Sequence, residues 1–408
     1  MGQNFFSQEG RKIFRFGQIL GWWSLTAVAL ASIKVPTYQH APKIRVRIGK
    51  DLASMEVSGV DLKRMIYPLQ DQRSFAGRKM VRFNCLSKLP AKGNSTLLAS
   101  FSSKTGLLAL GDEKYHGKLY VLANEGHQNC DVINELSMEY YLASLLSKEM
   151  NASWHQEALK AQAVAARSYA LYKMLTSNNK NSFFDLESSE RDQVSGTFLD
   201  ATNATSEATM QTRGEILVAA NSGRLTPIFY HAQCAGGKTL LPSQVWGDQV
   251  EGYQSVSCKY SERPQGKGDW DGALRNEQMF DFLRWAAKIE NLPRLRQKLT
   301  ATAAAHQALP EILVAPDRLE NVQLRLYVDD QVVVLNKPLM RRFFGRTTFP
   351  SNHFVLQKKN GLFVLNGKGL GHGVGMPQLG AKTMAEQGWS YREILKYYFP
   401  GHRLKKIY

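Results

Sequence analysis

A single carboxylate is the first residue of this sequence that could carry chemistry. Glu149 stands between Lys148 and Met150, at the joint between two apolar segments that are predicted to be helices. Apolar surroundings raise the pKa of a carboxyl group, and a carboxylic acid that stays protonated near neutral pH is what general-acid cleavage of a glycosidic bond needs. Taken alone, a Glu at a helix end is more often a solvated surface group.

A glycine-rich segment, Asn366 to Gln378, is the second such feature. Its glycines alternate with other residues from Gly367 to Gly375. This density is costly in chain entropy and predicts a backbone pressed close to a ligand or to another strand. The segment fits neither a phosphate-binding loop nor a dinucleotide-binding fingerprint. His372 within it could contact a ligand or hydrogen-bond the backbone of its own loop.

Metal and disulfide chemistry are weakly signalled. The nearest approach to a metal site is His231-Ala-Gln-Cys234, which offers only two candidate ligands, so no cofactor is predicted. The four cysteines suit an oxidising compartment and allow two bridges in three pairings: Cys85, Cys130, Cys234 and Cys258.

Two consecutive helices would position Glu149. The first is predicted from an N-cap at Ser137 to about Asn151, and the second from a capping box at Ser153-x-x-Gln156 to Met174. On the second helix, Lys160 and Arg167 lie at the edge of a face of small residues, which another element could approach closely.

The remaining patterns predict an α+β fold, with antiparallel strands and segregated helices. Period-2 alternation predicts a strand at 43–48, and turn signals up to about residue 130 indicate a sheet-rich region. Later strands are expected at 119–122, 215–218, 228–231 and 362–365, a hairpin at 324–335, and helices at 276–289, at 293–307 and after the capping box Ser390-x-x-Glu393.

The net charge and the N-terminal residues indicate which binding partners and which location to expect. The 408 residues carry 52 Lys and Arg against 35 Asp and Glu, a net charge of +17, which attracts polyanions. Residues 1–33 combine basic residues, an apolar run and Ala29-Leu30-Ala31, the pattern of an export signal or an uncleaved anchor. We therefore expect an exported protein of the periplasm or cell wall, with membrane contact only through this segment. Nucleic acid is not expected, since no nucleic-acid-binding motif is present.

Two long motifs resemble the stage II sporulation protein D (SpoIID/LytB) family. They are Glu157 to Ala170 (EALKAQAVAARSYA), preceded by Glu149-Met150, and Gly369 to Ala381 (GLGHGVGMPQLGA) with Ser390 to Gly401. Weaker matches are Tyr115-x-Gly117, Tyr230 to Thr239 and Ser351 to Phe354, in the family's order.

The resemblance implies a peptidoglycan lytic transglycosylase that cleaves between N-acetylmuramic acid and N-acetylglucosamine without water, leaving a 1,6-anhydro end. Its implied substrate is glycan from which an amidase has already removed the peptides. Glu149 matches the catalytic acid, and Arg167 matches a position expected to contact the glycan. The implied groove or loop-support residues are Lys160, His231, Thr239, His372 and Gln378. A non-catalytic enhancer of a cell-wall amidase is the alternative function.

The sequence departs from the family at two positions. Leu370 and Leu379 stand where the family usually has tryptophan, which removes sugar-stacking or packing surface. Some relatives bind zinc through His and Cys near the site. In an exported chain, Cys234 with Cys258 resembles a disulfide pair instead, with Cys85 and Cys130 as a second possible bridge.

The resemblance and the element patterns together divide the chain. The predicted parts are a signal or anchor at 1–33, a sheet-rich region at 43–130, a catalytic core at 131–260, a helical and hairpin insertion at 261–360, and a C-terminal segment at 361–408 that completes the core.

Overall fold

The structure is a computed structural model that describes residues 32–67, 69–85, 97–123, 129–178, 182–188, 196–235, 237–261, 268–304 and 308–408. The predicted export segment, apart from its last two residues, lies outside this range. Among the described residues, no helix combines the length and the apolar character needed to cross a membrane. The fold is α+β, as predicted.

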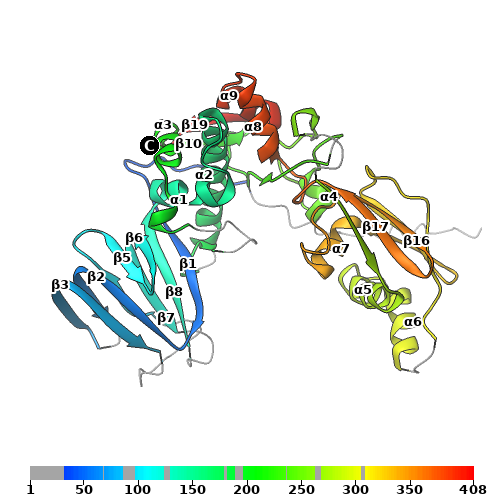
Figure 1. Ribbon diagram of the computed structural model, residues 1–408, viewed down its shortest axis with the longest axis horizontal. Coiled ribbons are helices and arrows are strands. Elements are labelled where there is room, and N and C mark those ends of the chain that lie inside the picture. The colour runs from blue at the N-terminus through cyan, green and yellow to red at the C-terminus, as the bar shows by residue number, and fades with distance from the viewer. Residues whose placement is uncertain are drawn as a thin grey trace, which may run out of the picture.

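An antiparallel-rich sheet forms the N-terminal part, drawn in blue and cyan at the lower left of Figure 1. Its strand order is β6-β5-β2-β4-β7-β8-β1-β9, with β3 paired to β2. The sheet continues past residue 130 because β8 pairs with β1 along its length and runs directly into the first helix. The strands are β1 (Lys43–Leu52), β2 (Ser54–Ile66), β3 (Asp71–Asn84), β4 (Leu97–Ser102), β5 (Leu107–Leu110), β6 (Glu113–His116), β7 (Lys118–Ala123), β8 (Cys130–Ser137) and β9 (Leu186–Glu187).

The helices predicted around Glu149 are present above the sheet. They are α1 (Met138–Glu149) and α2 (Gln156–Asn178), and Figure 1 shows α3 (Asn203–Gln211), α8 (Gln378–Glu386) and α9 (Tyr391–Tyr398) beside them. Small residues on α2, including Ala158, Ala161 and Ala165, pack in one core with α8 and α9. The small-residue face predicted from the sequence is made instead by Ala163, Ala166 and Ala170, of which Ala166 and Ala170 pack with Tyr141 and Leu145 of α1 and not with the C-terminal helices.

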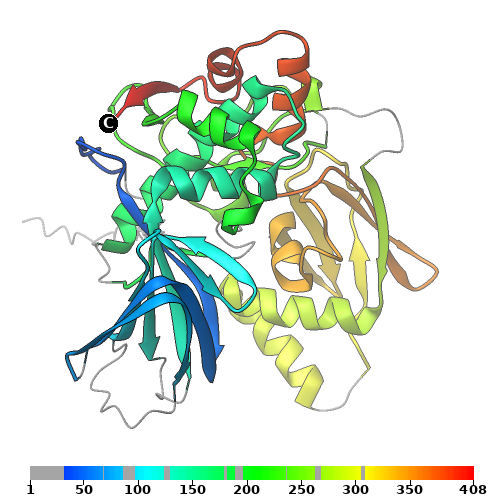
Figure 2. The ribbon, with the colours of Figure 1, turned by 60° about the vertical axis from the view of Figure 1, so that its left-hand side comes forward.

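A separate unit, here called the inserted unit (residues 268–304 and 308–368), has its own hydrophobic core. Figure 2 shows it at the lower right, beside the sheet and below the helices. It contains one three-stranded sheet in the order β12-β17-β16 and another in the order β13-β14-β15. Its elements are β12 (Asp269–Leu274), α5 (Asn276–Ile289), α6 (Pro293–Ala304), β13 (Ile312–Val314), β14 (Gln323–Val328), β15 (Gln331–Asn336), α7 (Lys337–Phe344), β16 (Phe354–Lys359) and β17 (Leu362–Lys368).

The end of the chain returns to the helical region. β10 (Glu215–Ala219) pairs with β19 (His402–Lys406), and β11 (Tyr230–His231) pairs in parallel with β18 (Met376–Pro377). The short elements of this region are α4 (Pro242–Trp246) and the 3-10 turns η1 (Phe198–Asp200) and η2 (Lys259–Ser261). The helix α9 begins at the predicted capping box, in which the Ser390 side chain accepts a hydrogen bond from the Glu393 backbone N–H.

Candidate functional site

Glu149 is the last residue of α1, and the backbone turns sharply after it. Met150 is extended, and its N–H still donates to the Leu146 carbonyl at 2.8 Å, which ends the helix. The Asn151 side chain then accepts hydrogen bonds from the backbone N–H and the hydroxyl of Ser153, at 2.9 and 2.8 Å. The Glu149 side chain is half-buried and Met150 is buried, so the carboxyl group lies at the margin of an apolar core.

The glycine-rich segment lies against the middle of the chain, as its density of glycine predicts. Leu370 and Gln233 exchange two backbone hydrogen bonds of 2.9 Å, and the Leu379 N–H donates to the Ala232 carbonyl at 3.1 Å. At Gly375 the backbone has φ +72°, and an added Cβ atom would lie 2.0 Å from the Phe229 carbonyl oxygen. Only glycine permits this approach, and the contact is to the protein's own backbone.

This docking brings Gln378 to Glu149 across 229 positions of sequence. Gln378 is the first residue of α8 and is buried, and its Nε2 donates to Glu149 Oε2 at 3.3 Å. The amide therefore orients the carboxyl group without adding charge to the site.

A groove of about 410 Å³ opens at this pair. Its wall comes from the α1–α2 joint, from the mid-chain and glycine-rich segments, and from the inserted unit. The lining residues are Glu149, Met150, Asn151, Trp154, Ala232, Gln233, Gly268, Asp269, Trp270, Pro350, Gly369, Leu370, Gln378 and Leu379. Asp269 places a second carboxylate in the groove, 3.8 Å from Lys368 Nζ.

Two of the predicted histidines hydrogen-bond the backbone of the glycine-rich segment. His231 is buried, and its Nδ1 hydrogen-bonds the Val374 carbonyl at 3.1 Å, while burial lowers its pKa to about 3. His372 Nδ1 accepts from the Val374 N–H at 3.0 Å, and its ring lies 5.1 Å from that of Trp246. Enclosure among these rings lowers the pKa of His372 well below its ordinary value. Both rings are therefore neutral at physiological pH.

Thr239 and the second pair of cysteines hold together the two ends of the neighbouring loop, which contains α4. Thr239 Oγ1 accepts a hydrogen bond from the Val256 N–H at 3.1 Å, and Cys234 is bonded to Cys258 with a Cα separation of 6.0 Å. Cys85 and Cys130 form the other disulfide, so both expected pairings are present. With its sulfur in a disulfide, Cys234 is not available as a zinc-binding thiolate. The part of the chain that the structure describes holds no cluster of three or more metal-ligating side chains.

The two basic side chains of α2 do not line the groove. Lys160 is half-buried and pairs with Glu157 at 2.7 Å on its own helix. Arg167 is fully buried, and its guanidinium donates two hydrogen bonds of 3.1 and 2.8 Å to the Glu139 carboxylate. This burial differs from the predicted glycan contact, because the side chain has no exposed surface from which to reach a sugar.

The groove also contains residues that sequence reasoning missed, namely Trp154, Gln233, Asp269 and Trp270. Trp154 lies in the capping segment before α2, close enough to Glu149 in sequence to have been proposed. Trp270 and Asp269 carried no usable signal, because their place depends on how the inserted unit sits beside the helices.

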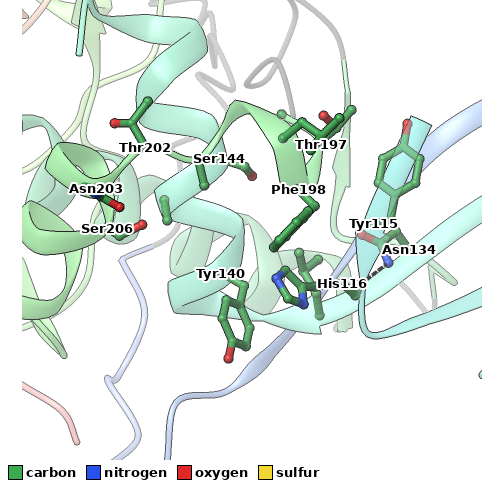
Figure 3. Close-up of a pocket in the computed structure, with 15 residues that line it drawn as sticks. Tyr115, His116, Asn134, Tyr140, Ser144, Thr197, Phe198, Thr202, Asn203 and Ser206 are labelled. Atoms are coloured by element: carbon green, nitrogen blue, oxygen red, sulfur yellow. Dashed lines mark hydrogen bonds between the residues drawn. The ribbon is translucent and has the colours of Figure 1, made fainter. Parts of the chain in front are cut away.

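A second hollow of about 290 Å³ lies between the sheet and the start of α1 (Figure 3). His116 stacks on Tyr140 with ring centroids 4.2 Å apart and meets Phe198 edge-on at 4.8 Å. Asn134 Nδ2 donates to the His116 carbonyl at 2.8 Å, which fixes the strand beneath the rings. Neither Glu149 nor Gln378 lines this hollow, so it is separate from the groove.

Comparisons with known proteins give one consistent result. The sequence model of SpoIID, Stage II sporulation protein, matches residues 126–218. An uncharacterised protein of Brachyspira hyodysenteriae is 32% identical over 310 residues, which cover 74% of each chain. The amidase enhancer of Bacillus subtilis is 29% identical over 297 residues, 64% of this chain and 40% of that protein. Stage II sporulation protein D of Bacillus amyloliquefaciens is 25% identical over 282 residues, 66% of this chain and 74% of that protein.

Proposed function

This chain belongs to the SpoIID/LytB family, and from that premise we propose that it is a peptidoglycan lytic transglycosylase with Glu149 as its general acid and base. The relatives' names, sporulation protein and amidase enhancer, support a role in the cell wall. Two disulfides support a location outside the cytoplasm. The bond cleaved would be the one between N-acetylmuramic acid and N-acetylglucosamine, in glycan from which an amidase has removed the peptides.

One carboxyl group suffices for this reaction. Protonated Glu149 gives its proton to the glycosidic oxygen as the bond from C1 of the muramic acid breaks. The carboxylate then takes the proton of the sugar's own C6 hydroxyl, whose oxygen bonds to C1 and closes the 1,6-anhydro ring. No water is consumed, and a second carboxylate at the spacing that hydrolases require is not needed.

The observation that carries the proposal is the pairing of Glu149 with Gln378 at the groove. A neutral amide holds the carboxyl group in one orientation, so the proton can be presented to a bound glycan repeatedly in the same geometry. Met150 and the apolar core behind it limit the access of water.

We expect purified sacculi treated with the protein and an amidase to release anhydro-muramyl products, as detected by mass spectrometry. Glu149→Gln should reduce this release by at least about a thousandfold, because the amide cannot donate the proton. Glu207→Gln, an exposed carboxylate on α3, is the matched control and should leave the release unchanged.

A variant of Asp269, the other carboxylate of the groove, distinguishes formation of the anhydro ring from hydrolysis. Asp269→Asn should still produce anhydro ends if the sugar hydroxyl is the nucleophile. Reducing ends instead of anhydro ends from the wild type, abolished by Asp269→Asn, would show a two-carboxylate hydrolase. Full activity of Glu149→Gln would overturn the assignment of the acid.

The second candidate function is enhancement of an amidase without cutting, favoured by the relative that carries that name. Here wild type and Glu149→Gln would accelerate peptide release from intact sacculi equally, and neither would yield anhydro products. Measuring both products in one digest distinguishes the two functions.

A further inference from the structure

Trp270 lines the groove and is held in the inserted unit by several contacts. It is a cross-strand partner of Gly367, and a Cβ atom on Gly367 would fall 2.1 Å from the indole ring. The ring therefore lies directly on the glycine backbone, and its orientation is set by that contact. Phe349 and Phe354 pack against it with centroids 6.0 Å away.

The polar atom of this indole is already satisfied. Trp270 Nε1 donates to the Ser351 Oγ at 3.2 Å, and Ser351 is itself buried. With this nitrogen engaged, the rest of the half-buried indole, which Trp270 brings to the groove lining, is apolar. An oriented, apolar aromatic surface beside polar side chains is the surface that the C–H face of a pyranose ring fits.

The aromatic side chains that line the groove come from outside the glycine-rich segment. Leu370 and Leu379, the leucines of the glycine-rich segment, line the groove together with Trp154 and Trp270. A leucine offers apolar contact but no flat ring on which a sugar can stack. Two tryptophans contributed by other segments, the α1–α2 joint and β12, restore aromatic surface around Glu149.

We propose that Trp270 is the sugar-stacking platform of the groove, with Trp154 as a second aromatic contact, so that the inserted unit sets glycan affinity. The ligand class is a strand of N-acetylhexosamines. The pyranose face would lie on the indole, and the Asp269 and Gln233 side chains line the same groove as partners for hydroxyl and acetamido groups. This inference rests on the proposed function for the identity of the glycan, though not for the stacking itself.

The test measures binding separately from cutting. A peptide-free tetrasaccharide of alternating N-acetylglucosamine and N-acetylmuramic acid is titrated calorimetrically into Glu149→Gln protein, which cannot consume it if Glu149 is the acid. Adding Trp270→Leu should raise Kd roughly tenfold or more, while Trp270→Phe, which keeps a ring, should stay within about threefold. Thermal unfolding of each variant checks that the inserted unit is folded.

Trp285→Phe is the matched control, because Trp285 packs on the core of the same unit and does not line the groove. It should leave Kd unchanged. Equal Kd values for Trp270→Leu and Trp270→Phe, or an equal loss in Trp285→Phe, would overturn the inference. Weaker binding by Trp270→Leu without anhydro products from the wild type would keep the platform and remove the transglycosylase.

Discussion

Arg167 and Glu139 form a buried ion pair at which several elements meet. Besides the two bonds between them, Arg167 donates to the Thr209 carbonyl at the end of α3 and to the Glu215 carbonyl in β10, each at 3.1 Å. The Tyr408 hydroxyl donates to Glu139 from the end of the chain. The pair therefore joins α1, which carries Glu149, to α2, α3 and β10.

Removing one partner of such a pair leaves a buried, uncompensated charge. We expect Arg167→Ala to lower the free energy of unfolding by about 3–5 kcal/mol, measured by urea denaturation. Arg167→Lys should recover only part of this loss, since an ammonium group cannot reproduce the two-pronged contact. Lys298→Ala, which removes two surface ion pairs, with Asp329 and with Asp330, should change stability little.

The same variants test the role that the family resemblance implies. If Arg167→Ala kept wild-type stability but lost affinity for the tetrasaccharide, the arginine would be a glycan contact despite its burial. The sequence could single out Arg167 because it lies at the edge of a face of small residues and matches a family position. It could not tell a surface ligand from a core ion pair, because the partner Glu139 stands in another helix.

At the scale of elements, the glycine-rich segment and α8 fix the position of Gln378. Gly375→Ala would press a methyl group into the Phe229 carbonyl, and the segment would have to move away from β11. Gly388 also has a positive φ, +88°, but nothing lies within 4 Å of an added Cβ atom. Both glycines thus have a positive φ that an alanine would adopt only with strain, and only Gly375 also makes a close approach.

We expect Gly388→Ala to cost about 1 kcal/mol of stability and to leave the release of anhydro products unchanged. Gly375→Ala should cost more than that and reduce the release at least about tenfold, because Gln378 would leave Glu149. Unfolding in urea and the sacculus digest provide the two measurements. Identical behaviour of the two variants would show that the close approach does not position the site.

The elements with strong local patterns could be predicted from the sequence, but the contacts between distant elements could not. The helices around Glu149, the hairpin at 323–336 and the cap of α9 follow from periodicity and capping chemistry within each segment. The glycine-rich segment was correctly expected to press against something. Its partner, β11, could be found only from the fold, because parallel pairing between distant segments has no local signature.

For the whole molecule, three buried histidines link stability to pH. Burial lowers the pKa of His231 to about 3 and those of His353 and His402 to about 4. All three are at most 7% exposed. Their unfolded forms take up protons below about pH 6.5, whereas the folded forms stay neutral until the lower values are reached.

The stability that these neutral histidines contribute should therefore be complete above about pH 6.5 and should be lost as the pH falls toward 4. Each histidine contributes a slope that approaches about 1.4 kcal/mol per pH unit. Urea unfolding at a series of pH values measures this slope. His402→Gln should reduce it by one histidine's share. An unchanged slope in His402→Gln would contradict the assignment.

The division of the whole chain was only partly visible in the sequence. The sequence predicted an insertion at 261–360 from its helices and hairpin, and the core of the inserted unit also includes Phe363 and Leu365 of β17. Its contribution to the groove depends on docking between two cores. No pattern within either one encodes that docking, and for this reason Trp270 escaped prediction.

The pairing of Glu149 with Gln378 has a consequence for the time at which activity appears. Glu149 is synthesised 229 residues before Gln378, its hydrogen-bond partner, and contacts between segments so far apart in sequence form late in folding. A chain synthesised only as far as Lys368 would carry Glu149 without a complete groove. We expect a chain ending at Lys368 to release no anhydro products from sacculi, because it lacks Gln378 and the helices α8 and α9.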